Sequence, residues 1–398
     1  MSGTWLSDFL DFTAATGPYW TTGPSSFVVD AIQNTYGFAT LCEEHPDKKM
    51  IRGGANIKFG AIYQGNGTFE NSKSGQTLTA VNPQRLQTGT ANWRFSRAHM
   101  AFTEQEVMLN EAAYYGTEAA RFQQYVKLRD EKMAALMVEV WNGLEANLWR
   151  EPVAANMESA DGLDQYSLPV FINEFTNGLF ANPGGAAWTT IEGLSPTAAA
   201  TNSKWKCKNR TYNSAVVNNQ DNIVSTFDLM WNDVEYRKPR TFSERMTDPM
   251  LKQQRIGTSS KGRAILSQLL RGSQDRFVAG PQDPAYADPQ FHGIPVERYS
   301  SLDTAALYAN TAGTGLATEG AAGTGNRTGP RYYWWNAAFL YPVFHEERYF
   351  FLTDPMKTPT VPDSSVVVFY IWYNIICTSL MRQGFVGPAS GFATYGTY

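Results

Sequence analysis

The sequence has little charge and few cysteines. Only 18% of its 398 residues are Asp, Glu, Lys or Arg, whereas soluble domains usually carry about 25%. Its three cysteines, Cys42, Cys207 and Cys377, lie far apart and form no CxxC pair. This spacing argues against a disulfide framework and a structural zinc site, and it fits a reducing compartment.

Motifs that carry chemistry are also missing. The four histidines, at positions 45, 99, 292 and 345, show neither HExxH nor HxxxH spacing, so they do not suggest a metal site. There is no GxSxG elbow, and Gly257–Arg263 lacks the spacing of a phosphate-binding loop. We therefore expect no catalytic, cofactor-binding or metal-binding residues, and no enzyme activity.

Nothing in the sequence points to a membrane or to secretion. The N-terminus lacks a basic segment followed by an apolar stretch, so no signal peptide is visible. The longest apolar run, residues 366–377, contains Asn374 and is too short to cross a bilayer. We interpret this run as a buried strand.

Large aromatic side chains are abundant, and Phe, Trp and Tyr make up 14% of the residues. Interfaces between proteins are enriched in these residues and depleted of Lys and Glu. The composition therefore fits a chain that buries much of its surface against partners. A large aromatic core within one chain explains it equally well.

A long helix is expected from Thr117 to Arg150. Apolar residues recur there at helical spacing, and the stretch contains no proline. Two shorter helices are expected at Asn218–Asp233 and Lys261–Asp275. Strands are expected at Glu297–Leu302, within Tyr332–Leu352 and at Ser364–Thr378.

The N-terminal part is predicted to be extended. Residues 1–57 show no sustained periodicity apart from a short helix expected at Ser26–Asn34, and they resemble an arm anchored by aromatic residues. Ile57–Tyr63 and Ala91–Thr103 alternate like strands around a polar segment. We interpret these two strands as a long two-stranded flap, which needs a neighbour because an isolated hairpin is only marginally stable.

Charge is unevenly distributed along the chain. Residues 201–276 contain 14 Lys and Arg against 7 Asp and Glu, although the whole chain has a net charge of −4. Within this region four cations alternate with Trp205, Cys207 and Asn209, and they are Lys204, Lys206, Lys208 and Arg210. In a strand all four would lie on one side. That side is either an anion-facing stripe or, as we favour, an exposed face opposite a buried Trp and Cys.

Taken in order, these elements resemble the major capsid protein of tailed bacteriophages, which has the Hong Kong-type fold. Ala91–Thr103 leading into the helix at Thr117–Arg150 is similar to the family's extended loop and spine helix. Phe291–Tyr299 resembles a strand late in the axial domain, and Ser364–Pro388 resembles the closing strands. Segments 176–214 and 312–330 have no obvious counterpart in the simplest members.

The resemblance implies an α+β capsid fold with four parts. These are an N-terminal arm (1–57), an extended β-hairpin loop (58–103), a peripheral domain with the spine helix (104–160 and 331–370) and an axial domain (161–330 and 371–398). Five residues on the arm and flap are the expected inter-subunit contacts, because Trp and Arg dominate interface hot spots. They are Trp5, Trp20, Trp93, Arg94 and Arg97. We expect Trp93→Ala to reduce shell yield and leave the secondary structure of the monomer intact.

The implied function is structural. Copies of the chain would assemble into hexamers and pentamers of an icosahedral head enclosing double-stranded DNA. Assembly would take place in the host cytoplasm with a separate scaffolding protein, a portal and a decoration protein, with non-specific DNA contact and no membrane. Two alternatives stay open, a shell protein of a bacterial nanocompartment with the same fold and a cytoplasmic hydrolase with an aromatic-lined carboxylate site.

Overall fold

The computed structural model describes residues 37–38, 41, 49–62, 86–103, 118–150, 152–173, 188–196, 205–212, 220–234, 254–271, 289–303, 330–358 and 361–388. These ranges contain both helices and sheets, which confirms a mixed α and β chain. The chain divides into two compact units. Unit 1 comprises residues 1–33, 97–143 and 350–370, and unit 2 comprises residues 34–96, 144–349 and 371–398.

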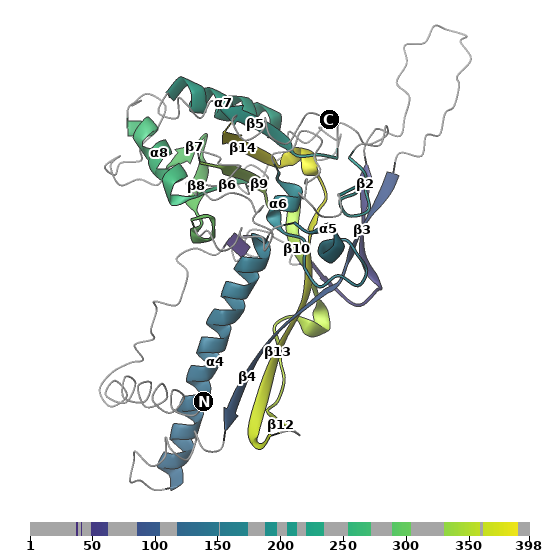
Figure 1. Ribbon diagram of the computed structural model, residues 1–398, viewed down its shortest axis with the longest axis vertical. Coiled ribbons are helices and arrows are strands. Elements are labelled where there is room, and N and C mark those ends of the chain that lie inside the picture. The colour runs from purple at the N-terminus through teal and green to yellow at the C-terminus, as the bar shows by residue number, and fades with distance from the viewer. Residues whose placement is uncertain are drawn as a thin grey trace, which may run out of the picture. The chain divides into compact units, whose positions relative to one another are not determined.

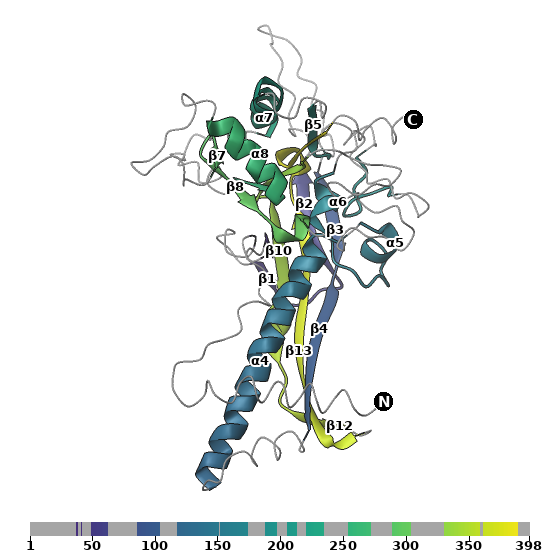
Figure 2. The ribbon, with the colours of Figure 1, turned by 60° about the vertical axis from the view of Figure 1, so that its left-hand side comes forward.

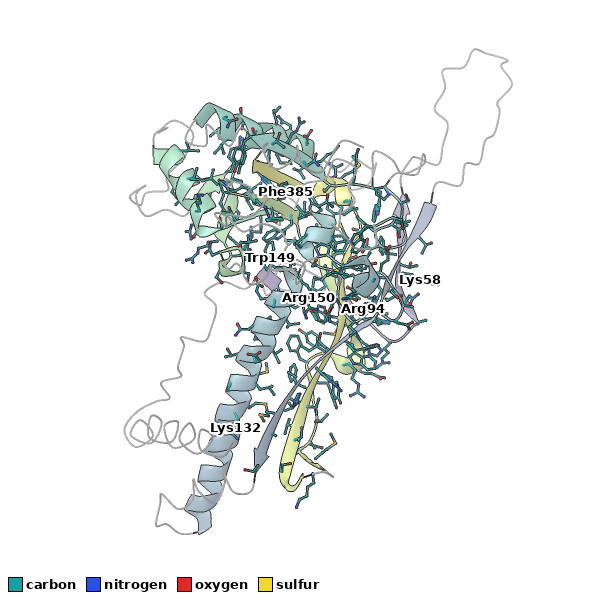
Figure 3. All side chains as sticks on the ribbon, viewed as in Figure 1. Lys58, Arg94, Lys132, Trp149, Arg150 and Phe385 are labelled. Atoms are coloured by element: carbon teal, nitrogen blue, oxygen red, sulfur yellow. The ribbon has the colours of Figure 1, made fainter. Side chains whose placement is uncertain are left out.

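The predicted long helix is confirmed as α4 (Glu118–Leu148), which has 31 residues and a length of roughly 47 Å. Among the described side chains of this helix, the buried apolar ones follow a spacing of four residues. They are Leu136 and Val140 in unit 1 and Leu144 and Leu148 in unit 2. This spacing places them along one face of the helix. Figure 3 shows Trp149 and Arg150 directly after the helix.

Unit 1 also contains an antiparallel arrangement of strands. The first part of β13 (Val361–Cys377) pairs with β11 (Phe351–Leu352) and β12 (Met356–Thr358). The long strand β4 (Arg94–Thr103) also pairs with β13. Phe350 joins these strands to the helix, because its ring lies 5.7 Å from both Trp141 and Phe369.

In unit 2, the last part of β13 continues as a small sheet. It pairs antiparallel with β10 (Leu340–His345), which pairs in parallel with β1 (Lys49–Ile51). Phe38 is fully buried beside this sheet, with its ring edge-on to Tyr373 at 5.2 Å.

A second sheet of unit 2 has six strands in the order β5, β14, β9, β6, β8 and β7. In chain order they are β5 (Lys208–Tyr212), β6 (Gln254–Thr258), β7 (Gln290–Phe291), β8 (Ile294–Arg298), β9 (Tyr332–Asn336) and β14 (Gly384–Pro388). Within this sheet β9 pairs antiparallel with both β6 and β14.

Two amphipathic helices pack against this sheet, and both lie where the sequence predicted a helix. They are α7 (Gln220–Val234) and α8 (Ser260–Arg271), and both views place them beside its strands (Figures 1 and 2). Phe227 and Met230 of α7 and Leu266 of α8 share one buried cluster with Ile256 and Trp334 of the sheet. This apolar cluster therefore lies between the helices and the six-stranded sheet.

The flap prediction needs a correction. The strand β2 (Asn56–Ile62) pairs with β3 (Leu86–Asn92) and not with residues 94–103. The chain leaves the hairpin at Trp93, and β4 joins β13 instead. Non-local pairing therefore divides one alternating stretch between two sheets. Inside the hairpin the Phe59 ring lies over Gly89, where any Cβ would meet it at 2.2 Å.

Short elements complete the described chain. They are α5 (Ala154–Met157), α6 (Leu168–Phe171), η5 (Ser300–Leu302), η7 (Glu346–Arg348) and η8 (Leu380–Arg382). The strand expected at 297–302 begins earlier, at Ile294, and gives way to η5. The helix expected at Ser26–Asn34 and the Gly-rich segment 312–330 lie outside the described residues.

Candidate inter-subunit surface

The start of β4 directs successive side chains to opposite faces. Arg94 and Ser96 contact the loop that follows α5, whereas Phe95 contacts Trp372 of β13. This alternation is the ordinary geometry of a strand. Both surfaces belong to unit 2, so one strand segment organises two surfaces that face different ways.

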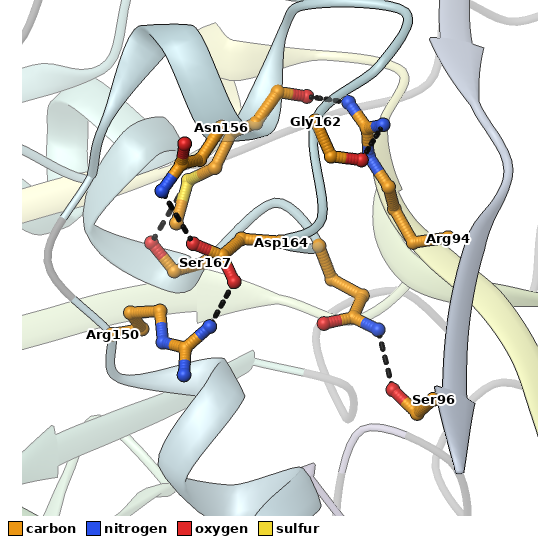
Figure 4. A network of polar contacts seen from close by, with 9 residues as sticks. Arg94, Ser96, Arg150, Asn156, Gly162, Asp164 and Ser167 are labelled. Carbon is orange, nitrogen blue, oxygen red and sulfur yellow. Dashed lines mark hydrogen bonds and ion pairs between the residues drawn. The ribbon is translucent and has the colours of Figure 1, made fainter.

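Arg94 organises the first of these surfaces. Its side chain is only 1% exposed, and its guanidinium donates to the main-chain carbonyls of Met157, Ser159, Ala160 and Gly162. Figure 4 shows the contact with Gly162. The bonds to Met157 and Ser159 measure 2.7 and 2.6 Å. A planar guanidinium carries several donors in a fixed geometry, so this single side chain fixes the path of residues 157–162.

Further polar contacts hold the same loop at its far end. Arg150 pairs with the Asp164 carboxylate, which also accepts from the Asn156 amide at 3.2 Å (Figure 4). Gln165 Nε2 donates to Ser96 Oγ at 2.6 Å. At Gly162 an added Cβ would come within 1.9 Å of the Asn156 carbonyl oxygen. The loop therefore packs closely against Arg94, and it has no room for a side chain at position 162.

The second surface is a stack of aromatic and cationic side chains. Phe95 is 62% exposed, and its ring meets Trp372 edge-on at 4.6 Å. The Arg348 guanidinium lies 5.6 Å from the Trp372 ring centroid, within the range of a cation–π contact. Beneath them the His345 ring contacts both Trp372 and Trp93. We call Phe95, Trp372 and Arg348 the aromatic stack.

A tight turn ties the hairpin to the small sheet. Glu192 and Gly193 both have positive φ, at 56° and 73°, and the strand-like contact of Ile191 with Leu194 closes the turn. The Glu192 carbonyl accepts from Thr90 N of β3, and its carboxylate accepts from Cys377 N, both at 2.9 Å. Burial raises the pKa of the Glu192 carboxyl well above its usual value.

Another buried carboxylate, Glu145, lies near the end of α4. It is 0% exposed and accepts from Phe38 N at 2.9 Å, from Trp149 Nε1 at 2.7 Å and from Ser301 Oγ at 3.4 Å. Burial raises the pKa of Glu145 to about 7, although these hydrogen bonds act in the opposite direction. The carboxylate therefore joins three distant segments of the chain within unit 2.

The chain resembles known proteins in its fold and not in its sequence. No protein-family model matches the chain, and neither does any curated protein sequence. Among solved structures, a chain of the Cyanophage A-1(L) capsid asymmetric unit is 11% identical. It aligns with a TM-score of 0.55 over 92% of this chain and 96% of its own. This chain has the fold of a phage capsid protein.

Two other capsid chains match with lower scores. A chain of the Cyanophage P-SCSP1u capsid is 10% identical, with a TM-score of 0.49 over 92% of both chains. A chain from the capsid of a native GTA particle is 12% identical, with a TM-score of 0.48 over 95% of this chain and 98% of its own.

The residues that were expected to contact other subunits differ in their exposure to solvent. Trp93 is buried, and its indole N–H donates to the Gly54 carbonyl at 3.0 Å. The Arg94 guanidinium donates to main-chain carbonyls of its own chain, and these bonds compensate its buried charge. Arg97 is exposed on β4. Trp5 and Trp20 lie outside the described residues.

Two cations of the predicted stripe, Lys208 and Arg210, lie on β5 at the edge of the six-stranded sheet. Lys206, Lys208 and Arg210 are half-buried and alternate with the buried Trp205 and Cys207, while Lys204 lies outside the described residues. Arg210 pairs with Asp233 of α7 at 2.6 Å. One cation of the stripe is thus used within the chain, and whether the others face an anion stays a prediction.

The described residues contain neither a metal ligand set nor a membrane-spanning helix. Within the described ranges, no three His, Cys, Asp or Glu side chains gather as a metal ligand set. Among the helices that the structure describes, none is long and apolar enough to cross a membrane.

Sequence reasoning did not find the aromatic stack or the exposed loop beside Arg94. The alternation along residues 91–103 was visible, and it separates Phe95 from Arg94 and Ser96. What the sequence could not supply is the partner of each face, because Trp372 and the loop at 157–164 are far away along the chain. The alternation alone nevertheless marked Phe95 as the residue opposite the arginine.

Proposed function

We propose that this chain is a non-enzymatic major capsid subunit that assembles with copies of itself into the head of a tailed bacteriophage. The observation that carries the proposal is the likeness to the Cyanophage A-1(L) capsid chain, which extends over 92% of this chain.

The finer architecture belongs to the proposal as well. In it, copies form hexamers and pentamers of an icosahedral shell with the Hong Kong-type arrangement. The arm and the β2–β3 hairpin reach neighbouring subunits, α4 serves as the spine helix, and the peripheral and axial domains follow. Two-stranded hairpins are marginal alone, so a flap of this kind gains stability when a neighbouring subunit covers it.

The described surfaces support a role in association. Unit 2 exposes Phe95 beside Trp372 and Arg348, and Trp and Arg are typical of interface hot spots. A shell repeats each contact many times, so weak contacts add to a stable lattice. Arg97, Trp5 and Trp20 are proposed as further contacts, and Lys206 and Lys208 as an anion-facing edge.

The proposed partners follow from a role in a phage head. They are other copies of the chain, a separate scaffolding protein, a portal, a decoration protein and packaged double-stranded DNA contacted without sequence preference. The product is the virion, and assembly takes place in the host cytoplasm.

The test is to express the chain alone and together with its genomic neighbours, and to examine the products by negative-stain microscopy and sedimentation. Shells, tubes or rings of five or six copies would support a lattice-forming subunit. Shells that take up DNA only with packaging partners would favour the phage head over a cargo compartment. A monodisperse monomer under every condition would refute the proposal.

A further inference from the structure

Leu163 is the most exposed large apolar side chain on the described surface of unit 2. It is 82% exposed and lies in the loop that Arg94 holds from behind. We propose that Leu163 of one subunit packs against the aromatic stack of a second copy of this chain, forming a head-to-tail contact. This inference rests on the proposed self-assembly and names one contact within it.

The loop is held in place before any partner binds. Contacts hold the chain on both sides of Leu163. The carbonyls of Ala160 and Gly162 before it accept from Arg94, and the side-chain carboxylate of Asp164 after it pairs with Arg150. A side chain on a fixed loop loses little conformational entropy on binding. Because the buried Arg94 holds the main chain of this loop, Leu163 is already positioned for contact before a partner binds.

The aromatic stack is suited to receive an apolar side chain. Phe95 is 62% exposed, so much of its ring is available, while its edge contact with Trp372 fixes its orientation. Arg348 lies over the Trp372 ring. Rigid aromatic rings bury large apolar areas at low entropic cost, and such clusters are where binding energy concentrates.

Charge around the two surfaces is complementary. The exposed Asp161 lies two residues before Leu163, and the Arg348 cation borders the aromatic stack. Two exposed acids, Glu346 and Glu347, directly precede Arg348, and Glu346 pairs with Arg52 at 2.8 Å. Seating Leu163 on Phe95 and Trp372 would bring Asp161 toward Arg348, and opposite charges fix register at an interface.

The placement of the two surfaces indicates a head-to-tail contact and not a two-fold dimer. Ser96 and Arg94 contact the Leu163 loop, while Phe95 between them points the other way. Each subunit therefore offers Leu163 on one side and receives a neighbour's leucine on the other. Head-to-tail contacts between unlike surfaces close into rings.

Cross-linking between two cysteine variants tests the contact. In a Cys42→Ser background, chains carrying Leu163→Cys are co-assembled with chains carrying Phe95→Cys and treated with a short bifunctional maleimide. We expect covalent dimers that contain one chain of each kind. Assemblies of either variant alone should give none, because the contact joins unlike surfaces. Leu229→Cys, an equally apolar exposed position on α7, mixed with Phe95→Cys is the matched control.

The outcomes separate this inference from the proposed function. Shells that form without any mixed dimer would overturn the Leu163 contact and leave the capsid role intact. A complete failure of the unaltered chain to assemble would refute the capsid role, and this contact with it.

A charge exchange decides the case in which a cysteine variant fails to assemble. Asp161→Arg and Arg348→Asp should each lower shell yield several-fold, and the double variant should restore much of it. Asp161 is exposed and Arg348 is half-buried, so circular dichroism is recorded for each variant to check that folding is unchanged. A double variant no better than the two single changes combined would contradict the contact.

Discussion

The Glu145 carboxylate accepts the backbone N–H of Phe38 across 107 residues of sequence, at a distance of 2.9 Å. This bond fastens Phe38 to the last turn of α4. The Phe38 ring is at the same time buried against Phe344 and Tyr373 of the small sheet. A buried acid thus holds the point where the N-terminal part of the chain enters unit 2, and its protonation should be visible in stability.

The first prediction concerns pH. Burial raises the pKa of Glu145 from 4.5 to about 7, so the folded state holds this proton more tightly than the unfolded state. The contribution of Glu145 to the free energy of unfolding is then greatest below about pH 4.5. It falls as the pH rises toward 7, by roughly 3 kcal/mol in all.

Urea unfolding of the unassembled subunit at several pH values checks this. Glu145→Gln removes the titration and keeps the shape, so the stability of the wild type relative to this variant should decline between pH 4.5 and 8. Glu139→Gln, an exposed change on the same helix, is the control. A difference that stays flat across this range would contradict the prediction.

The second prediction concerns Arg94. A lysine has a single ammonium group, which cannot reach all the carbonyls that the guanidinium binds. Arg94→Lys therefore leaves buried acceptors unsatisfied. We expect a loss of at least about 2 kcal/mol in the free energy of unfolding. Hydrogen exchange should also rise at residues 157–164. Arg97→Lys, at an exposed position, should change neither, and wild-type exchange in Arg94→Lys would show that the loop needs no arginine.

Some of these features could be predicted from the sequence, and others could not. The long helix was predictable because its apolar spacing and lack of proline are local properties. The path of residues 91–103 was not, because the switch from β2 to β13 as pairing partner takes place at Trp93 without any break in the alternation. The partners of Arg94 could not be predicted either, because the carbonyls that it binds lie more than 60 residues away in the chain.

The six-stranded sheet shows the same limit. Some of its strands were predicted, since β9 lies within Tyr332–Leu352 and β8 overlaps the strand expected at Glu297–Leu302, but no strand was predicted at β6. The order of the strands could not be predicted, because β9 pairs with β6 and β14, which are far from it in the chain.

The third prediction compares two glycines. A Cβ at Gly162 would come within 1.9 Å of the main-chain oxygen of Asn156, whereas a Cβ at Gly143 in α4 would meet nothing within 4 Å. Gly162→Ala should therefore lower the free energy of unfolding by about 1–3 kcal/mol. Gly143→Ala should raise it by about 0.5–1 kcal/mol, because alanine restricts the unfolded chain more than glycine does. Urea denaturation monitored by circular dichroism measures both, and equal effects would count against this loop geometry.

The last prediction revises the expectation for Trp93. Its side chain is buried, donates to the Gly54 carbonyl and lies 5.4 Å from the His345 ring. Trp93→Ala should therefore destabilise the unassembled subunit by about 3–5 kcal/mol, as expected for truncating a buried aromatic residue. Any fall in shell yield would then follow from lost folding. Trp93→Phe keeps a ring but loses the hydrogen bond and should cost about 1 kcal/mol.

Phe95→Ala separates folding from association at the neighbouring position. Because Phe95 is 62% exposed, its truncation should lower shell yield with a much smaller shift in the thermal midpoint. Calorimetry of the unassembled subunits and sedimentation of the assembled products measure the two effects separately. If Trp93→Ala keeps the wild-type midpoint and still forms no shells, Trp93 contacts a neighbouring subunit after all. The hydrogen bond to Gly54 would then contribute little to stability.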